Sequence, residues 1–563
     1  MKRLLPALLL LALAIPAFAQ KKPFSVIEAT IPEMQAALRE KRVTSRELVL
    51  QYLVRIATYE DQLNAIITVN PKALDEADAL DRERAAGKVR GPLHGIPVAL
   101  KDNIHTTDIR TTGGALAFAD LVPPYDATVT KNLREAGAII LAKTQMTELA
   151  NWVAGNPAMP TNYNALTGYG FNPYDPRRDP REATADGRPA LATGGSSSGT
   201  GTAANFWAAN VGTETSGSIL SPANGNMLAA IKPTVGRISR YGIIPITADQ
   251  DTAGPMARSV TDAAILMGAL ESASPDPNDA ATKACPPPPG RDYTRFLKRD
   301  GLKGARIGIP RAWYYEKMVV PGGTSTEPRG GLNPDQTRAM NEAIEVLRAQ
   351  GAIIVDPANI PSVVDTNPAN NILNFGVCTD MDSVKERKCS VNLAYGMERD
   401  FNLWLQSLGD RAPVKTLTEL RRWNRSHEKM GAIKYGQSLL DISDAMDLEL
   451  FRARYEADRA TDIRLGATHG IDEALRTHNL DALFFPGPNG ANLAARPGYP
   501  TVMVPYALVA NAPTTAFPTD FNAKPAPMGV SFVGTACSEP TLIRLAYAFE
   551  QATKKRVPPP LFP

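Results

Sequence analysis

The segments Gly194-Gly195-Ser196-Ser197-Ser198-Gly199 and Thr213-Glu214-Thr215-Ser216-Gly217-Ser218 decide how this chain folds. Both combine glycine with hydroxyl side chains, which is the composition of tight turns. Residues 201–208 between them are small or apolar and predict a buried helix. Because a strand-turn-helix-turn path brings the chain back toward its starting point, we expect the two serine-rich turns to lie side by side.

Ser218 is the candidate nucleophile of the second turn. It follows Gly217, and Thr215 and Ser216 lie just upstream, so several backbone N–H groups of one turn can converge on a point. Such a convergence forms an oxyanion hole, in which each donor is worth a factor of about 10²–10³ in rate. A lone serine among small residues is usually only a turn residue, so the assignment depends on a base nearby.

A third segment supplies that base as a lysine at the end of an apolar run, Gly91-Pro92-Leu93-His94-Gly95-Ile96-Pro97-Val98-Ala99-Leu100-Lys101-Asp102. Desolvation at the edge of a buried strand would lower the pKa of Lys101 and leave part of it neutral. A neutral lysine is a base, so it can activate a serine without histidine. The alternative is a solvated lysine that pairs with Asp102.

The alternation of helical and strand patterns predicts an α/β fold. Thr30 with Glu33, and Thr44 with Glu47, have the spacing of capping boxes and predict two N-terminal helices. Buried strands are predicted at residues 98–100, 138–141, 306–310, 352–355, 482–485 and 501–504. The Pro- and Gly-rich stretch at residues 274–333 is either a boundary between two halves or, as we favour, a variable surface excursion from one domain.

Charge composition limits the class of partner. The chain has 563 residues with 61 basic and 58 acidic side chains, and it contains no long run of like charge that would suggest a nucleic-acid surface. We therefore expect a small-molecule or peptide substrate, no nucleic acid, and a monomer or homodimer. The five histidines have no metal-ligand spacing, so no metal is expected.

The N-terminus has the pattern of a secretion signal. Lys2 and Arg3 precede an apolar run, and Ala17-Phe18-Ala19 has the small-x-small pattern of a signal peptidase site. This predicts a signal peptide over residues 1–19 and a secreted or periplasmic protein. The apolar run is too short to span a bilayer, which needs about 20 residues, so no stable membrane anchor is expected.

Four cysteines then lie where disulfides can persist: Cys285, Cys378, Cys389 and Cys537. Cys378 and Cys389 are close enough in sequence to close a short loop. The sequence leaves all three full pairings open, as well as four free buried thiols.

Several ordered blocks resemble the amidase signature family. They are Gly-Gly-Ser-Ser-Ser-Gly, Thr-Glu-Thr-x-Gly-Ser and the lysine segment, with further blocks at residues 231–237, 251–259, 497–502 and 529–532. The resemblance extends over residues 25–555. It implies one α/β domain over residues 20–563, built on a large mixed sheet between helical layers. The run from Tyr395 to Gly436 and the triple serine are most similar to the peptide amidase and broad acylamidase branch.

The resemblance also implies roles for single residues. Ser218 would be the nucleophile, Ser196 the bridging serine held by a non-proline cis peptide bond, and Lys101 the base. The backbone N–H groups of Thr215, Ser216, Gly217 and Ser218 would form the oxyanion hole. The implied reaction is two-step acyl transfer through an acyl-enzyme, which releases ammonia or an amine from a peptide C-terminal, aryl or aliphatic amide. The resemblance implies that this reaction needs no metal or organic cofactor.

The chain departs from the family pattern in three places. The interval between Ser196 and Ser218 is about two residues shorter, which predicts a trimmed connecting helix, or a shifted register in which Ser197 is the bridging serine. Ser216 replaces a frequent glycine, and Leu220 stands where many relatives have arginine. We interpret these changes as tuning of the pocket. Glu214 and Leu220 disfavour the aminoacyl-tRNA amidotransferase branch, and so does the predicted secretion signal.

Two other functions stay open. Gly195-Ser196-Ser197-Ser198-Gly199 also matches the G-x-S-x-G nucleophile elbow of α/β-hydrolases, which would make Ser197 the nucleophile of an esterase with His469 or His478 as base. No apolar strand leads into this motif, which disfavours it. A catalytically silent extracytoplasmic binding protein on the same scaffold is the other alternative, although such a protein has no need for two serines and a lysine.

Overall fold

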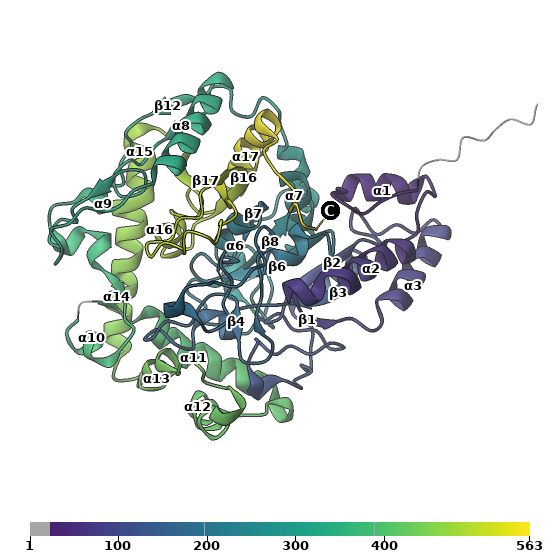
Figure 1. The fold of residues 1–563 in the computed structure, drawn as a ribbon, viewed down its shortest axis with the longest axis horizontal. Helices are drawn as coiled ribbons and strands as arrows, with labels where there is room; N and C mark the ends of the chain where they lie inside the picture. Colours follow the sequence, from purple (N-terminus) through teal and green to yellow (C-terminus); the bar gives the residue numbers. More distant parts are fainter. Residues whose placement is uncertain (1–22, 196–197, 388, 563) are drawn as a thin grey trace, which may run out of the picture.

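The computed structural model describes residues 23–195, 198–387 and 389–562. In these ranges a mixed sheet of 11 strands runs through the molecule in the order β1-β3-β2-β6-β8-β7-β16-β17-β15-β9-β12, with helices on both faces (Figure 1). Its strands are β1 Ile66–Val69, β2 Pro97–Lys101, β3 Ile139–Thr144, β6 Ala209–Glu214, β7 Ala229–Lys232, β8 Thr252–Ala257, β9 Arg306–Gly308, β12 Ile353–Val355, β15 Ala482–Pro486, β16 Thr501–Val509 and β17 Ala526–Val533. The predicted α/β fold with a large mixed sheet is confirmed.

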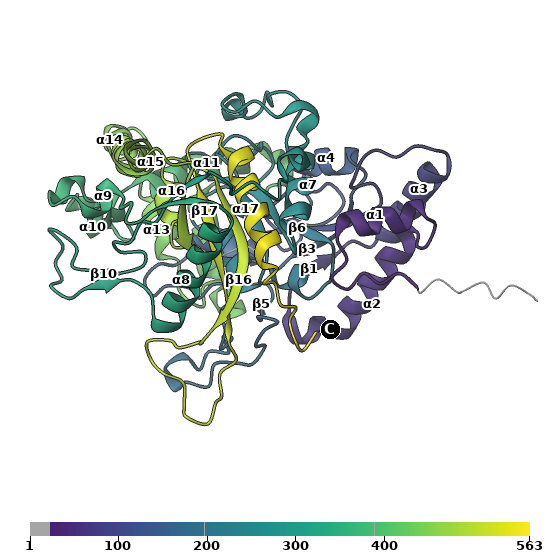
Figure 2. The same ribbon diagram turned by 90° about the horizontal axis from the view of Figure 1, so that it is seen from above.

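Helices flank this sheet along its whole length. In chain order they are α1 Ile31–Arg39, α2 Ser45–Leu63, α3 Ala73–Ala85, α4 Thr128–Glu135, α5 Thr200–Ala203, α6 Leu220–Gly225, α7 Val260–Leu270, α8 Pro334–Ala349, α9 Pro361–Val364, α10 Met381–Lys385, α11 Asn392–Ser407, α12 Leu417–Ser426, α13 Ser438–Asp444, α14 Arg452–Ile463, α15 Asp472–His478, α16 Ala491–Ala495 and α17 Glu539–Thr553. Figures 1 and 2 show α1–α3 at one end of the molecule and α9 and α14 at the opposite end.

Short two-stranded ladders form outside the large sheet. They pair β4 Tyr163–Asn164 with β5 Gly168–Tyr169, β10 Lys317–Met318 with β11 Arg329–Gly330, and β13 Gly376–Val377 with β14 Cys389–Ser390. The helices α11, α12 and α13 lie together beside the sheet (Figure 1) and share a second hydrophobic cluster that includes Phe118, Phe401 and Trp404.

Local sequence explains where the first helices begin. The side chains of Thr30 and Thr44 each accept a hydrogen bond from the backbone N–H of the glutamate three residues later. Each glutamate carboxylate in turn accepts a hydrogen bond from the threonine backbone N–H, so both capping boxes are present. The strands β2, β3 and β6 are buried at every position. Continuous burial fits a parallel arrangement covered on both faces, in which β2 lies between β3 and β6.

The helix predicted over residues 201–208 is wrong beyond Ala203. The side chain of Trp207 folds back over Gly201, where an added β-carbon would lie 2.2 Å from the indole ring. The indole N–H also donates to the Thr202 hydroxyl at 2.7 Å. Since these contacts require the chain to reverse, α5 ends after four residues.

Two disulfides settle the pairing that the sequence left open. Cys285 bonds to Cys537, and Cys378 bonds to Cys389. The first bond ties the stretch at residues 274–333 to the turn that precedes α17. Strands from before, within and after this stretch belong to the same sheet, and a single domain stays our interpretation.

The predictions of a signal peptide and of secretion concern the N-terminal residues. The expected signal peptide, residues 1–19, lies outside the described residues, so secretion stays a prediction. Within the described ranges, the helices are all too short or too polar to cross a membrane.

Candidate active site

Lys101 lies at the carboxyl end of β2, at the edge of the sheet where β6 also ends. Its side chain is fully buried, and Nζ donates to the carbonyl oxygen of Thr213 at 3.2 Å and to its hydroxyl at 2.9 Å. The alternative of a solvated lysine paired with Asp102 is therefore wrong. Asp102 is an ion-pair partner of Lys143 instead, with 3.4 Å between the charged atoms.

The surroundings of Lys101 set its charge. Burial lowers the pKa of Lys101 to about 7, although the nearby carboxylates of Asp251 and Glu214 oppose the shift. A substantial fraction of the amine is therefore neutral at neutral pH and able to accept a proton. This is the state that the predicted base requires.

The two serine-rich turns lie against each other, as predicted. A β-carbon on Gly195 would lie 2.9 Å from Cα of Ser218 and 3.0 Å from the carbonyl oxygen of Gly217. One on Gly194 would lie 2.4 Å from the carbonyl oxygen of Ser221. Only glycine permits this approach, so the Gly-Gly pair brings the first turn directly onto the candidate nucleophile.

Ser196 and Ser197 lie outside the described residues, so the bridging serine, its cis peptide bond and the alternative role of Ser197 stay predictions. Their flanks are well held. Gly195 contacts Ser218 on one side, and on the other the Asn210 side chain of β6 donates to the carbonyl oxygen of Ser198 at 3.1 Å.

The second turn is only partly exposed, since Thr215 and Gly217 are buried. Gly217 has a φ of 86°, Ser218 is half-buried and Ser216 is exposed. The Glu214 carboxylate accepts the N–H groups of Ile219 at 2.7 Å and Leu220 at 2.9 Å. These two hydrogen bonds hold the turn in place. They also occupy the N–H groups of Ile219 and Leu220, so these groups are not among the predicted oxyanion donors at residues 215–218.

Two residues that contact Thr215, Gln250 and Asp251, were not predicted from the sequence to be site residues. The Thr215 hydroxyl donates to Asp251, and the Gln250 side chain donates to the carbonyl oxygen of Thr215 at 3.2 Å. Burial raises the pKa of Asp251 to about 6. Asp251 begins one of the blocks that carried the family resemblance, but nothing in its spacing indicated that it reaches across to the oxyanion turn.

A strained backbone segment borders the same region. Leu149, Ala150 and Asn151 have φ values of 42°, 58° and 73°, which are left-handed conformations that cost non-glycine residues free energy. Ala150 lines a small cavity together with Thr213 and Thr215. Consecutive strain of this kind is concentrated at functional sites, and no pattern in the sequence indicated it.

The structure gives little support to the elbow interpretation. The ring nitrogens of His469 contact the carboxylates of Asp365 at 2.9 Å and Glu473 at 2.8 Å, so this histidine is engaged elsewhere. His478 ends α15, and residues 190–194, directly before the first turn, form no strand. The part of the chain that the structure describes also contains no cluster of three or more acidic, histidine or cysteine side chains suited to a metal.

Comparison with known proteins decides the family, since the amidase family model matches residues 47–543. The chain belongs to the amidase family. It is 33% identical to a probable amidase of Arabidopsis thaliana, over 95% of this chain and 92% of the relative. It is also 31% identical to one of the subunits of glutamyl-tRNA(Gln) amidotransferase from Thermosynechococcus vestitus, over 93% of this chain and 98% of the relative.

Solved structures agree with this membership. The native peptide amidase of Stenotrophomonas maltophilia superposes with a TM-score of 0.77 at 35% identity, over 94% of this chain and 98% of that chain. An amidase family protein of Bacillus anthracis gives the same TM-score at 31% identity, over 95% and 92%. The protein is therefore an amide-hydrolysing enzyme, and the alternative of a catalytically silent binding protein is wrong.

Proposed function

We propose that the enzyme hydrolyses carboxylic amides through an acyl-enzyme on Ser218, with Lys101 as the base and Ser196 as the bridge between them. The observation that carries the proposal is the fully buried Lys101 amine, whose pKa is lowered to about 7 beside Thr213. The close contact between Gly195 and Ser218 supports it, because that contact brings the first turn onto the nucleophile.

In the first step, Ser218 Oγ attacks the carbonyl carbon and its proton passes to Ser196, while the Ser196 proton passes to Lys101. The carbonyl oxygen becomes an oxyanion that the N–H groups of residues 215–218 stabilise. The C–N bond then breaks, and Lys101 returns a proton through Ser196 to the departing amine. In the second step, water attacks the ester carbonyl carbon and gives a proton to Lys101 through Ser196. The ester C–O bond then breaks, the carboxylic acid leaves, and the relayed proton returns to Ser218 Oγ.

Peptide C-terminal amides are our first candidate among substrates. The support is the similarity to the peptide amidase of Stenotrophomonas maltophilia. Aryl and aliphatic amides are the other members of the proposed class. We also propose that the enzyme acts outside the cytoplasm, on the pattern of residues 1–19.

The test combines covalent labelling with turnover. We expect a fluorophosphonate to label Ser218 in the wild type, and Ser218→Ala and Lys101→Ala to lower amide hydrolysis by at least about 10³-fold. Lys232→Met is the matched control, because Lys232 is another fully buried strand-end lysine and its pKa is lowered to about 8. This variant should keep the label and most of the turnover. Labelling of Ser197 that survives Ser218→Ala would contradict the proposal and favour the elbow mechanism.

A further inference from the structure

We propose that Gln250, oriented by Asn392, is a positioning residue that sets the Thr215–Ser216 peptide plane and so aims the Ser216 N–H into the oxyanion hole. This inference rests on the proposed function, in which the backbone N–H groups of residues 215–218 stabilise the oxyanion.

Thr215 is held at two points. Its carbonyl oxygen accepts from Gln250 Nε2 at 3.2 Å, and its hydroxyl donates to Asp251. Gln250, Asp251 and Thr215 are all buried, with exposed fractions of 6%, 9% and 7%. Asp251 is fixed in turn by the N–H groups of Ile246 at 2.8 Å and Thr247 at 3.0 Å. The residue just before the exposed part of the turn therefore has little freedom to rotate.

Planarity carries this restraint to the next donor. The carbonyl of Thr215 and the N–H of Ser216 belong to one trans peptide unit and point in opposite directions. A donor that fixes the Thr215 carbonyl therefore fixes the direction of the Ser216 N–H. The same hydrogen bond polarises the peptide unit, which strengthens the N–H as a donor.

The orientation of the Gln250 carboxamide follows from its partners. The Thr215 carbonyl oxygen can only accept, so Gln250 must present its NH₂ group there and its oxygen on the other side. Asn392 Nδ2 donates to that oxygen at 3.1 Å. The Asn392 amide thus favours this orientation of the Gln250 amide over the rotated one, which would bring two oxygens together at Thr215.

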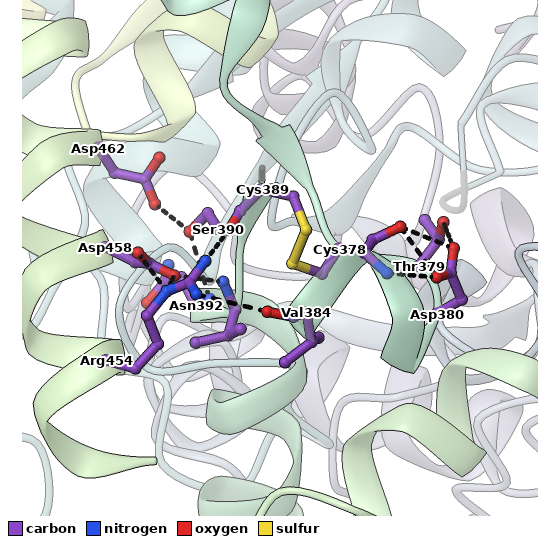
Figure 3. Close-up of a disulfide and its surroundings, with 12 residues drawn as sticks. Cys378, Thr379, Asp380, Val384, Cys389, Ser390, Asn392, Arg454, Asp458 and Asp462 are labelled. Atoms are coloured by element: carbon purple, nitrogen blue, oxygen red, sulfur yellow. Dashed lines mark hydrogen bonds and ion pairs between the residues drawn. A yellow bond between two sulfur atoms is a disulfide. The ribbon is translucent and has the colours of Figure 1, made fainter. Parts of the chain in front are cut away.

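The position of Asn392 is fixed by contacts with residues far from Gln250 in the sequence. It begins α11, and its N–H donates to the Ser390 hydroxyl at 3.3 Å, while Ser390 donates to Asp462 of α14 at 2.7 Å (Figure 3). The disulfide between Cys378 and Cys389 closes the loop just before Ser390. The restraint on the oxyanion turn therefore originates 142 residues farther along the chain than Gln250.

Gln250→Glu tests the donor directly. Above the pKa of the introduced carboxyl, which burial raises, a carboxylate faces the Thr215 carbonyl, and we expect kcat to fall about 10- to 100-fold with KM nearly unchanged. Below that pKa the protonated acid donates as the amide did. The ratio of variant to wild-type kcat should therefore rise toward 1 as the pH falls from 8.5 to 5.5.

Two further variants remove the donor in other ways. Gln250→Met deletes it, and Asn392→Asp offers only acceptors, so the Gln250 amide turns its NH₂ group toward Asp and its oxygen toward Thr215. We expect Gln250→Met to lower kcat about 10-fold or more at every pH. We expect Asn392→Asp to do so only above the pKa of its introduced carboxyl, because below that pKa the protonated acid donates to the Gln250 oxygen as the amide did. Affinity for a peptide aldehyde, which forms an oxyanion on Ser218, should fall in parallel with kcat/KM.

Gln35→Glu is the matched control. Gln35 is equally buried at 7%, and its Nε2 also donates to backbone carbonyl oxygens, those of Pro92 and His94. This variant is expected to lose thermal stability and to keep a pH-independent kcat ratio. Wild-type kcat in Gln250→Met, or a flat kcat ratio across pH in Gln250→Glu, would overturn the inference while Ser218 is still labelled. Turnover that persists in Ser218→Ala would overturn the proposed function itself.

Discussion

At the scale of single residues, the proposed base Lys101 would link catalysis to stability, because the proposed mechanism requires this buried amine to be neutral. Its pKa lies near 7 rather than at its ordinary 10.5. The sequence indicated this residue through the apolar run that ends at Leu100, because a lysine that follows a buried strand is desolvated.

We expect kcat/KM for amide hydrolysis to rise with pH through about 7 and to level off above it. The physical reason is that, in the proposed mechanism, only the neutral amine of Lys101 can accept the proton that leaves Ser218 through Ser196. Initial rates at low substrate concentration between pH 5.5 and 9.5 measure this profile. A profile that is flat from pH 6 to 9 would show that another group is the base.

Lys101→Met should abolish turnover and stabilise the fold near neutral pH. Between pH 10.5 and about 7 the unfolded lysine binds a proton and the folded one does not, so this lysine lowers stability progressively as the pH falls through that window. Removing the amine removes the penalty, and we expect Tm at pH 7.5 to rise by about 1–3 °C.

Lys143→Met is the contrasting variant. It leaves the buried Asp102 carboxyl without the cation that now lies 3.4 Å away. The loss of one partner from a buried ion pair costs about 3–5 kcal/mol, so Tm should fall. Equal Tm changes for the two lysine variants would contradict the assigned difference between a catalytic and a structural lysine.

At the scale of elements, the approach of two turns depends on glycine. Gly195 lies so close to Ser218 that an added β-carbon would meet backbone atoms, which cannot move aside as a side chain can.

Gly195→Ala should therefore lower kcat/KM by about 100-fold or more, because it displaces the nucleophile from the bridging serine. Gly376→Ala is the control, since nothing lies within 4 Å of its added β-carbon. Steady-state kinetics and Tm of both variants decide the matter. Near wild-type kcat/KM in Gly195→Ala would mean that the two turns need not touch for catalysis.

Elements also show where sequence reasoning succeeded. The capping boxes at Thr30 and Thr44 are local hydrogen-bond patterns, so they could be predicted from residues three apart. The predicted strands at β3, β9, β15 and β16 are apolar runs that are mostly buried between helical layers. The strand β12 also forms, but its predicted burial is wrong, because it is an edge strand of the sheet and Ile353 is exposed. The length of α5 could not be predicted, because a tertiary contact between Trp207 and Gly201 ends it.

At the scale of the whole molecule, the two disulfides close loops of very different length. Cys285 and Cys537 are 252 residues apart, whereas Cys378 and Cys389 are 11 residues apart. In the loop-entropy description the longer crosslink restricts the unfolded chain more, by about 3 kcal/mol.

Cys285→Ser with Cys537→Ser should therefore lower Tm more than Cys378→Ser with Cys389→Ser. The second pair should instead lower kcat at 25 °C, because its loop supports Asn392 and, through it, Gln250. Thermal melts and kinetics of both double variants test the contrast. An unchanged kcat in the second pair would place the support of Asn392 in α11 and α14 alone.

Local sequence was enough to predict the α/β class, because that class follows from the periodicity of short segments. It was also enough to predict the family, the candidate nucleophile and the candidate lysine base, because these follow from ordered motifs. The folded chain was needed for the cysteine pairing, the early end of α5, the strain at Leu149–Asn151 and the grip of Gln250 and Asp251 on Thr215. These features join residues far apart in the chain, and no local pattern specifies which distant side chain will fill a given hydrogen-bond position or space.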